Sequence, residues 1–248
     1  MLTQTALYVS GTEGYHTFRI PALAVTPNGT ILAIAEGRRH SVHDTGDIDL
    51  VAKRSVDGGR TWGPLQVVVP GEGHTSGNPT LLVDRASGRV LLPFCRNRSD
   101  GDQTAIMQGK SPRTVWITHS DDAGRAWSAP RELTAAVKDP RWTWYGVGPG
   151  HGMQLRSGRL VIPAYHVRPE RYDRSDLDWA PLLLSDDGGA TWRVGAQAQA
   201  GAARAWPWRR RRERSTSTPA ASGAWACARW LGASTRARPL RGRRPPAT

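Results

Sequence analysis

Short apolar runs separated by polar turns follow one another along the first 194 residues of the chain. In the first unit these runs cover residues 18–25, 30–36, 47–54 and 65–69. Pro27-Asn28-Gly29 separates the first two runs, and this combination predicts a β-hairpin. No stretch before residue 195 has the 3.6-residue apolar period of an amphipathic helix. The pattern therefore predicts an all-β protein.

An eight-residue turn occurs three times at a fixed spacing. It reads SVDGGRTW from Ser55, SDDAGRAW from Ser120 and SDDGGATW from Ser185, so the copies begin 65 residues apart (120 − 55 and 185 − 120). In each copy an aspartate can accept hydrogen bonds from backbone amides, and a glycine can adopt positive φ. A period of this size indicates an array of similar units. The terminal tryptophans of the three copies are predicted to occupy equivalent buried positions: Trp62, Trp127 and Trp192.

Each unit has the same order of elements. A hairpin is followed by a long loop, a third strand, the eight-residue turn and a fourth strand. Four-stranded sheets repeated about an axis make a β-propeller. Residues 1–194 are therefore expected to form about three blades.

Composition changes abruptly after this region. Residues 196–248 contain twelve arginines and one acid, Glu213, so this tail carries +11 of the net charge of +13, which leaves +2 (13 − 11) for the rest. The tail could bind nucleic acid or another acidic surface. It could also be an out-of-frame reading of a G+C-rich gene, and we favour this interpretation because the tail has four tryptophans and no lysine. We therefore expect residues 195–248 to be frameshifted or disordered, and nucleic-acid binding is not expected.

The sequence also bears on compartment. No apolar run approaches the roughly 18–20 residues of a membrane span, and residues 1–5 lack the basic and apolar regions of a signal peptide. Cys95 is the only cysteine before residue 195, so no disulfide framework is predicted there. We expect a cytoplasmic protein by default, and a secreted one if the true start lies upstream. The sequence gives no oligomeric state.

The eight-residue turn resembles the Asp box, S-x-D-x-G-x-T-W, of sialidases and related β-propellers. Phe18-Arg19-Ile20-Pro21 resembles the signature near the first strand of that family, and residues 148–155 resemble its animal cytosolic and bacterial members. The resemblance covers residues 8–194, about half of a family catalytic domain. It implies a six-bladed propeller of the sialidase type, represented here by about three blades. It also implies an exo-α-sialidase, a retaining glycoside hydrolase that releases terminal sialic acid from glycoconjugates and needs no cofactor.

The resemblance implies two arginines in the site. Sialic acid carries a carboxylate, which a guanidinium can bind through two parallel hydrogen bonds. Matched to the family, Arg19 is the first of three arginines that bind this carboxylate. Arg38 matches the arginine that borders the O4 side of the sugar, and Arg39 is its rival.

The polar loop at residues 40–49 is expected to supply the general acid, because glycosidic cleavage needs a proton delivered to the leaving oxygen. Counting back from residue 55, the catalytic aspartate of the family falls at Asp44, and Asp47 is the alternative. His40 and His43 have no third ligand in a metal-binding pattern, so no metal site is predicted.

The resemblance places three more side chains in the substrate pocket. Asn78 matches the residue that faces the N-acetyl and neighbouring groups of the sugar. Gln154 and Tyr165 match residues that line the pocket for the glycerol side chain.

Some family residues have no counterpart. The family nucleophile is a tyrosine, which a glutamate activates, and two more arginines complete the carboxylate site. The resemblance places all four in the region of the tail, which has no tyrosine. We assign none of these roles and expect an inactive fragment as written. The alternative is a non-catalytic Asp-box propeller that binds a glycan or a protein.

Overall fold

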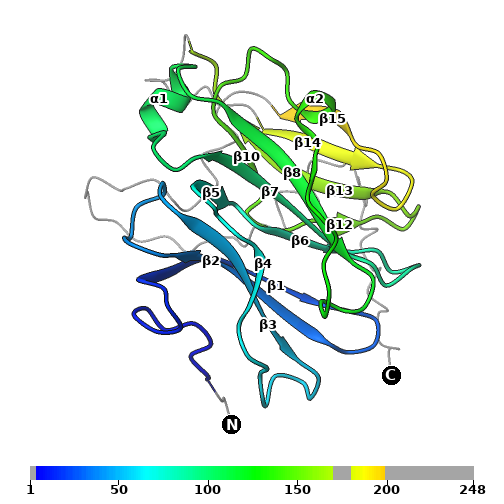
Figure 1. The fold of residues 1–248 in the computed structure, drawn as a ribbon. Helices are drawn as coiled ribbons and strands as arrows, with labels where there is room; N and C mark the ends of the chain where they lie inside the picture. The colour runs from blue at the N-terminus through cyan, green and yellow to red at the C-terminus, as the bar shows by residue number, and fades with distance from the viewer. Residues whose placement is uncertain (1–3, 170–179, 199–248) are drawn as a thin grey trace, which may run out of the picture. The chain divides into compact units, whose positions relative to one another are not determined.

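The structure is a computed structural model that describes residues 4–169 and 180–198. The first unit is a four-stranded antiparallel sheet in which each strand pairs with the next (Figure 1). Its strands are β1 (Thr17–Val25), β2 (Ile31–Arg38), β3 (Ile48–Ser55) and β4 (Gln66–Val69).

The second unit repeats this plan with an interrupted first strand. Two short strands, β5 (His74–Gly77) and β6 (Thr80–Val83), pair with opposite halves of β7 (Val90–Arg98). The sheet continues through β8 (Arg113–Ser120) to β9 (Arg131–Glu132).

The first strand of the third unit is interrupted as well. β10 (Tyr145–Val147) and β12 (Met153–Gln154) pair with opposite ends of β13 (Leu160–His166), and β11 (Gly150–His151) between them pairs with β6 of the second unit. β14 (Ala180–Ser185) and β15 (Arg193–Ala198) complete the sheet. The predicted order of elements is therefore present in all three units.

The first strand of every unit loses its regular pairing at a proline, through a register shift within β1 and through a full interruption in the second and third units. The residue before that proline has positive φ in each case: 54° at Ile20, 57° at Asn78 and 55° at Gly148. Positive φ is uncommon for residues with a side chain, above all for β-branched ones, and such strain tends to occur at functional sites. These irregularities therefore set one end of the sheets apart as a candidate functional end.

The Asp boxes lie at the opposite end, between the third and fourth strand of each unit. In all three, the serine hydroxyl donates to the aspartate at 2.8 Å, and the aspartate accepts the backbone N–H four residues later at 2.9 Å. These bonds close each turn without help from distant residues. The sequence repeat is thus a structural repeat.

Each later Asp box packs on the preceding unit. A Cβ at Gly124 would lie 2.5 Å from Leu32, and one at Gly189 would lie 2.8 Å from Leu91. Both leucines are the second residue of the second strand of the preceding unit. The boxes therefore join neighbouring units in one register.

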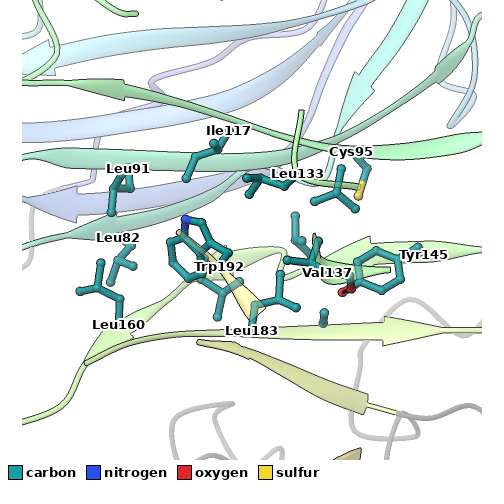
Figure 2. Packing of buried hydrophobic residues seen from close by; sticks show 14 of the residues in the cluster. Leu82, Leu91, Cys95, Ile117, Leu133, Val137, Tyr145, Leu160, Leu183 and Trp192 are labelled. Atoms are coloured by element: carbon teal, nitrogen blue, oxygen red, sulfur yellow. Dashed lines mark hydrogen bonds between the residues drawn. The ribbon is translucent and has the colours of Figure 1, made fainter. Parts of the chain in front are cut away.

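The three box tryptophans are not equally buried, so that prediction is wrong. Trp192 is 5% exposed and lies in a core shared by the second and third units. Figure 2 shows its ring with Leu91, Ile117 and Leu133 on one side and Leu160 and Leu183 on the other. Trp127 is only partly buried against the first core, and Trp62 is partly exposed. The reason is packing: Trp127 and Trp192 each have a preceding unit to cover them, whereas Trp62 belongs to the first unit.

Two short helices were not predicted. α1 (Gln103–Met107) begins after Asp102, whose side chain accepts from Ala105 N, and α2 (Thr134–Val137) follows β9. Both are too short to have an apolar period, so the sequence could not indicate them. Within residues 4–169 and 180–198, no helix is long and apolar enough to cross a membrane.

The predicted boundary at residue 194 falls inside β15, which continues to Ala198. The remainder of the predicted tail, residues 199–248, lies outside the described residues.

Candidate functional site

An acid–arginine cluster lies at the end of the first unit opposite its Asp box. We use this name for Arg19 on β1, Glu36 and Arg38 on β2, and Asp44 on the loop that follows. The pairing register places Arg19 opposite Glu36, and Thr17 opposite Arg38. Arg19 Nη1 and Arg38 Nη2 both lie 2.8 Å from the same oxygen, Asp44 Oδ1. Two guanidinium groups thus converge on one carboxylate.

Arg38 is the buried member of the cluster. It is 2% exposed, and its Nη2 donates to Glu36 Oε2 at 2.6 Å. Glu36 Oε1 in turn accepts from Asn78 N of the second unit at 2.9 Å. Burial raises the pKa of the Glu36 carboxyl, while the Arg38 guanidinium and the Asn78 N–H oppose this rise. The pair holds Arg38 rigidly while Arg19 and Asp44 remain largely exposed.

The loop that carries Asp44 is held on both sides of this residue. Arg38 Nη1 donates to Val42 O at 2.5 Å. On the other side, the Thr75 hydroxyl accepts from Gly46 N at 3.1 Å and donates to Gly46 O at 2.8 Å. Thr75 lies on β5, so the neighbouring unit fixes the position of the loop.

The alternative candidates, Arg39 and Asp47, lie outside the acid–arginine cluster. Arg39 Nη2 lies 2.6 Å from Asp49 Oδ2, and Arg39 Nε lies 3.4 Å from Asp47 Oδ2. Asp49 also accepts from the hydroxyl of Tyr15, whose ring fills the space beside Gly37. Arg39 and Asp47 therefore brace the base of the loop, while Arg38 and Asp44 lie in the cluster. This geometry favours Arg38 and Asp44 over the alternatives.

A second group connects the cluster to the third unit. Asn78 is half-buried, and its Nδ2 lies 3.4 Å from the hydroxyl of Tyr165 on β13. Its Oδ1 accepts from Arg113 Nη2 on β8 at 2.6 Å. Burial raises the pKa of Tyr165. The structure thus links Asn78 and Tyr165 directly, and Asn78 N joins them to Glu36.

Gln154 is not brought to this group. Its Nε2 donates to Asp84 Oδ1 at 2.5 Å and its Oε1 accepts from Arg85 N at 2.9 Å. Gln154 also pairs with Leu160, which pairs with Ser185 of the third Asp box. The predicted pocket residue therefore lies at the Asp-box end of the sheets.

Sequence reasoning missed three residues that organise the end of the sheets at which the acid–arginine cluster lies. These are Glu36, which lies at the end of a predicted strand, and Thr75 and Arg113, which belong to no motif. Their roles depend on contacts between units, which no local pattern reports. Among residues 4–169 and 180–198, no group of three or more His, Cys, Asp or Glu side chains could hold a metal ion.

Known proteins that resemble this chain identify its family. Residues 29–220 match the model of the BNR repeat-like domain. Sialidase-3 of Bos taurus is 39% identical over 194 residues, which cover 72% of this chain and 45% of the relative. An exo-alpha-sialidase of Aspergillus fumigatus is 39% identical over 175 residues, covering 61% of this chain and 42% of that protein. The chain belongs to the BNR-repeat family that includes the sialidases.

Solved structures show the same fold. The Hadza microbial sialidase Hz136 superposes with a TM-score of 0.68 at 28% identity, covering 77% of this chain and 39% of that one. The intramolecular trans-sialidase from Ruminococcus gnavus has a TM-score of 0.65 at 18% identity. The fold prediction is confirmed: residues 4–169 and 180–198 form three blades of a sialidase-type β-propeller. The chain spans less than half the length of the curated relatives named above.

Proposed function

We propose that this protein acts on sialylated glycoconjugates as an exo-α-sialidase that releases terminal sialic acid. The observation that carries the proposal is the convergence of Arg19 and Arg38 on one oxygen of Asp44. Arginines in this arrangement are suited to a planar carboxylate, which sialic acid carries at its anomeric carbon.

The cluster supplies two of the functions that the reaction needs. Arg19, which is half-exposed, binds the carboxylate of the substrate. The hydrogen bond to Glu36 keeps Arg38 in place beside it. A bound carboxylate competes with Asp44 for the guanidinium group of Arg19. Asp44 is then free to turn toward the glycosidic oxygen, where it acts as the general acid.

Asn78 and Tyr165 form the side of the site that lies between the second and third blades. Under this proposal Asn78 contacts the N-acetyl substituent of the sugar, and Tyr165 closes the pocket behind it. Gln154 has no part in the proposed site because it bonds to Asp84 and Arg85 at the other end of the sheets. The nucleophile and its activating glutamate are not assigned to residues of this sequence.

Binding of free sialic acid to the purified chain, measured by titration calorimetry or saturation-transfer NMR, tests the carboxylate assignment. Arg19→Ala is expected to weaken binding by about tenfold or more, because a charge-assisted pair is lost. Arg156→Ala is the matched control, since Arg156 is an exposed arginine in the turn after β12. Asp44→Asn should not weaken binding, because it removes the competitor for the arginines. Equal affinity of Arg19→Ala and Arg156→Ala would contradict the assignment.

Turnover separates the enzyme from the alternative function. The wild-type chain is tested for hydrolysis of aryl sialosides. If Asp44→Asn slows this hydrolysis, and slows it most for sialosides with poor leaving groups, the result supports the general-acid role. Binding that depends on Arg19 without any turnover is expected both of a sialidase fragment without its nucleophile and of the alternative, a non-catalytic propeller that binds sialylated glycans, so only turnover distinguishes the two.

A further inference from the structure

Arg113 is a buried cation that the proposed reaction does not use. It is 3% exposed, and its guanidinium carbon lies 4.5 Å from the centre of the Trp144 ring. Within the described part of the chain no carboxylate forms an ion pair with it. Burial of a cation without an anion is costly, so its hydrogen bonds have to compensate.

Those hydrogen bonds hold the guanidinium in one orientation. Nε donates to Tyr145 O at 2.7 Å, Nη1 donates to Asn97 Oδ1, and Nη2 donates to Asn78 Oδ1 at 2.6 Å. The three acceptors come from both the second and third blades. One nitrogen of Arg113 is thus committed to the amide of Asn78.

This contact decides which way the Asn78 amide faces. A guanidinium has only donors, so the Asn78 atom toward Arg113 has to be the oxygen. The nitrogen then faces the opposite side, where it donates to the Tyr165 hydroxyl at 3.4 Å. The amide nitrogen carries two hydrogens and Tyr165 accepts one. The chemistry of the partners therefore fixes Asn78 as a donor on the side that faces Tyr165.

We propose that Arg113 is a positioning residue that makes Asn78 present N–H, and never C=O, to the substrate. The site then favours a substituent that offers an acceptor oxygen over one that offers N–H at the same place. This inference rests on the proposed function, in which Asn78 meets the C5 substituent of the sugar.

The first arm of the test needs no ligand. NMR is used to observe the Asn78 side-chain amide protons and their nuclear Overhauser contacts to the Tyr165 ring. These contacts are expected in the wild-type chain and should be lost in Arg113→Met, where nothing holds the amide oxygen. Unchanged contacts in folded Arg113→Met would overturn the positioning role. The second arm covers the case in which this variant does not fold.

The second arm uses Asn78→Asp. The carboxylate oxygen that faces Arg113 keeps the hydrogen bond and adds an ion pair, so folding should be preserved. The atom on the opposite side changes from an N–H donor to an oxygen acceptor. The control is Asn28→Asp, because Asn28 lies in an exposed turn and only its Oδ1 makes contacts, to Thr26 and Thr30.

Two isosteric probes report the polarity of the pocket: N-acetylneuraminic acid, and its analogue in which a 5-O-acetyl ester oxygen replaces the N–H. The wild-type chain and Asn28→Asp should bind the ester at least as tightly as the amide. Asn78→Asp should change the ester-to-amide affinity ratio about tenfold in favour of the amide. An unchanged ratio in folded Asn78→Asp would overturn the inferred preference. If the wild-type chain binds neither sugar, the proposed function fails and this preference with it, and the NMR arm alone decides the positioning role.

Discussion

The two ends of the same three sheets are built in opposite ways. At the Asp-box end each unit makes the same bonds, from serine to aspartate to the backbone, within eight residues. At the other end the first strand of each unit loses its regular pairing at an equivalent proline, yet the residues before these prolines differ: Ile20, Asn78 and Gly148. Some contacts there run between blades, from Glu36 to Asn78 and from Asn78 to Tyr165. The repeating end therefore specifies how the blades stack, and the end that does not repeat carries the candidate chemistry.

The largest effect is expected from the box tryptophan that packs on a preceding blade. Trp192→Ala removes a ring that is 5% exposed and should lower the free energy of unfolding by about 3–5 kcal/mol. Trp127→Ala should cost less, and Trp62→Ala least, because both rings are partly exposed. Urea unfolding followed by circular dichroism measures the series. If all three variants lost the same free energy of unfolding, the preceding blade would add nothing to the burial of the box tryptophans.

The second prediction compares an acid from each end. Asp187 accepts from Ser185, Thr191 N and the Thr191 hydroxyl, so Asp187→Ala should cost about 1–2 kcal/mol, as loss of a helix cap does. Asp44→Ala should change stability by less than about 0.5 kcal/mol, because Asp44 is 58% exposed. The same unfolding experiment applies. A greater loss from Asp44→Ala would reverse the assignment of the two ends to stability and function.

This difference also explains what the sequence could predict. The Asp boxes are local, so their spacing indicated the blades and their strand order correctly. Arg19, Arg38 and Asp44 lie within or just after one hairpin, so short motifs could single them out, and their role in a site stays a prediction. Arg113 meets Asn78 across 35 positions and Tyr145 across 32, and no local pattern reports such contacts.

Gln154 also shows that a local motif does not reveal contacts between distant residues. The inner strand of the third blade is broken at residues 148–152, and the sequence does not reveal where it resumes pairing. Gln154 pairs with Leu160, at the end of β13 nearest the third Asp box. Tyr165 lies five positions after Leu160 on β13, toward the acid–arginine cluster. A motif match alone could not separate these two positions.

The third prediction concerns the loop between β2 and β3. Thr75→Val keeps the shape of the side chain and removes both hydrogen bonds to Gly46, which should cost about 1 kcal/mol or less. The loss should be local, so amide hydrogen exchange at Gly46 and its neighbours should accelerate while global unfolding changes little. Thr61→Val in the first Asp box is the control and should leave this exchange unaltered. Unchanged exchange in Thr75→Val would mean that Arg38 and Arg39 hold the loop without help from the second blade.

The smallest expected effect is the contribution that the Asp boxes make to the dependence of stability on pH. Hydrogen bonds from Thr191 and Ser185 lower the pKa of Asp187 from 3.8 to about 2, and similar bonds lower the pKa of Asp57 and Asp122. A carboxyl with a lowered pKa binds fewer protons in the folded state, so its contribution is complete above pH 4 and is lost as the pH falls toward 2. Solvent screens these exposed groups, so the slope per box should be shallow. Asp187→Asn should flatten the fall in melting temperature between pH 4 and pH 2. An identical pH profile for Asp187→Asn and the wild-type chain would show that the box bonds do not depend on the charge of the carboxylate.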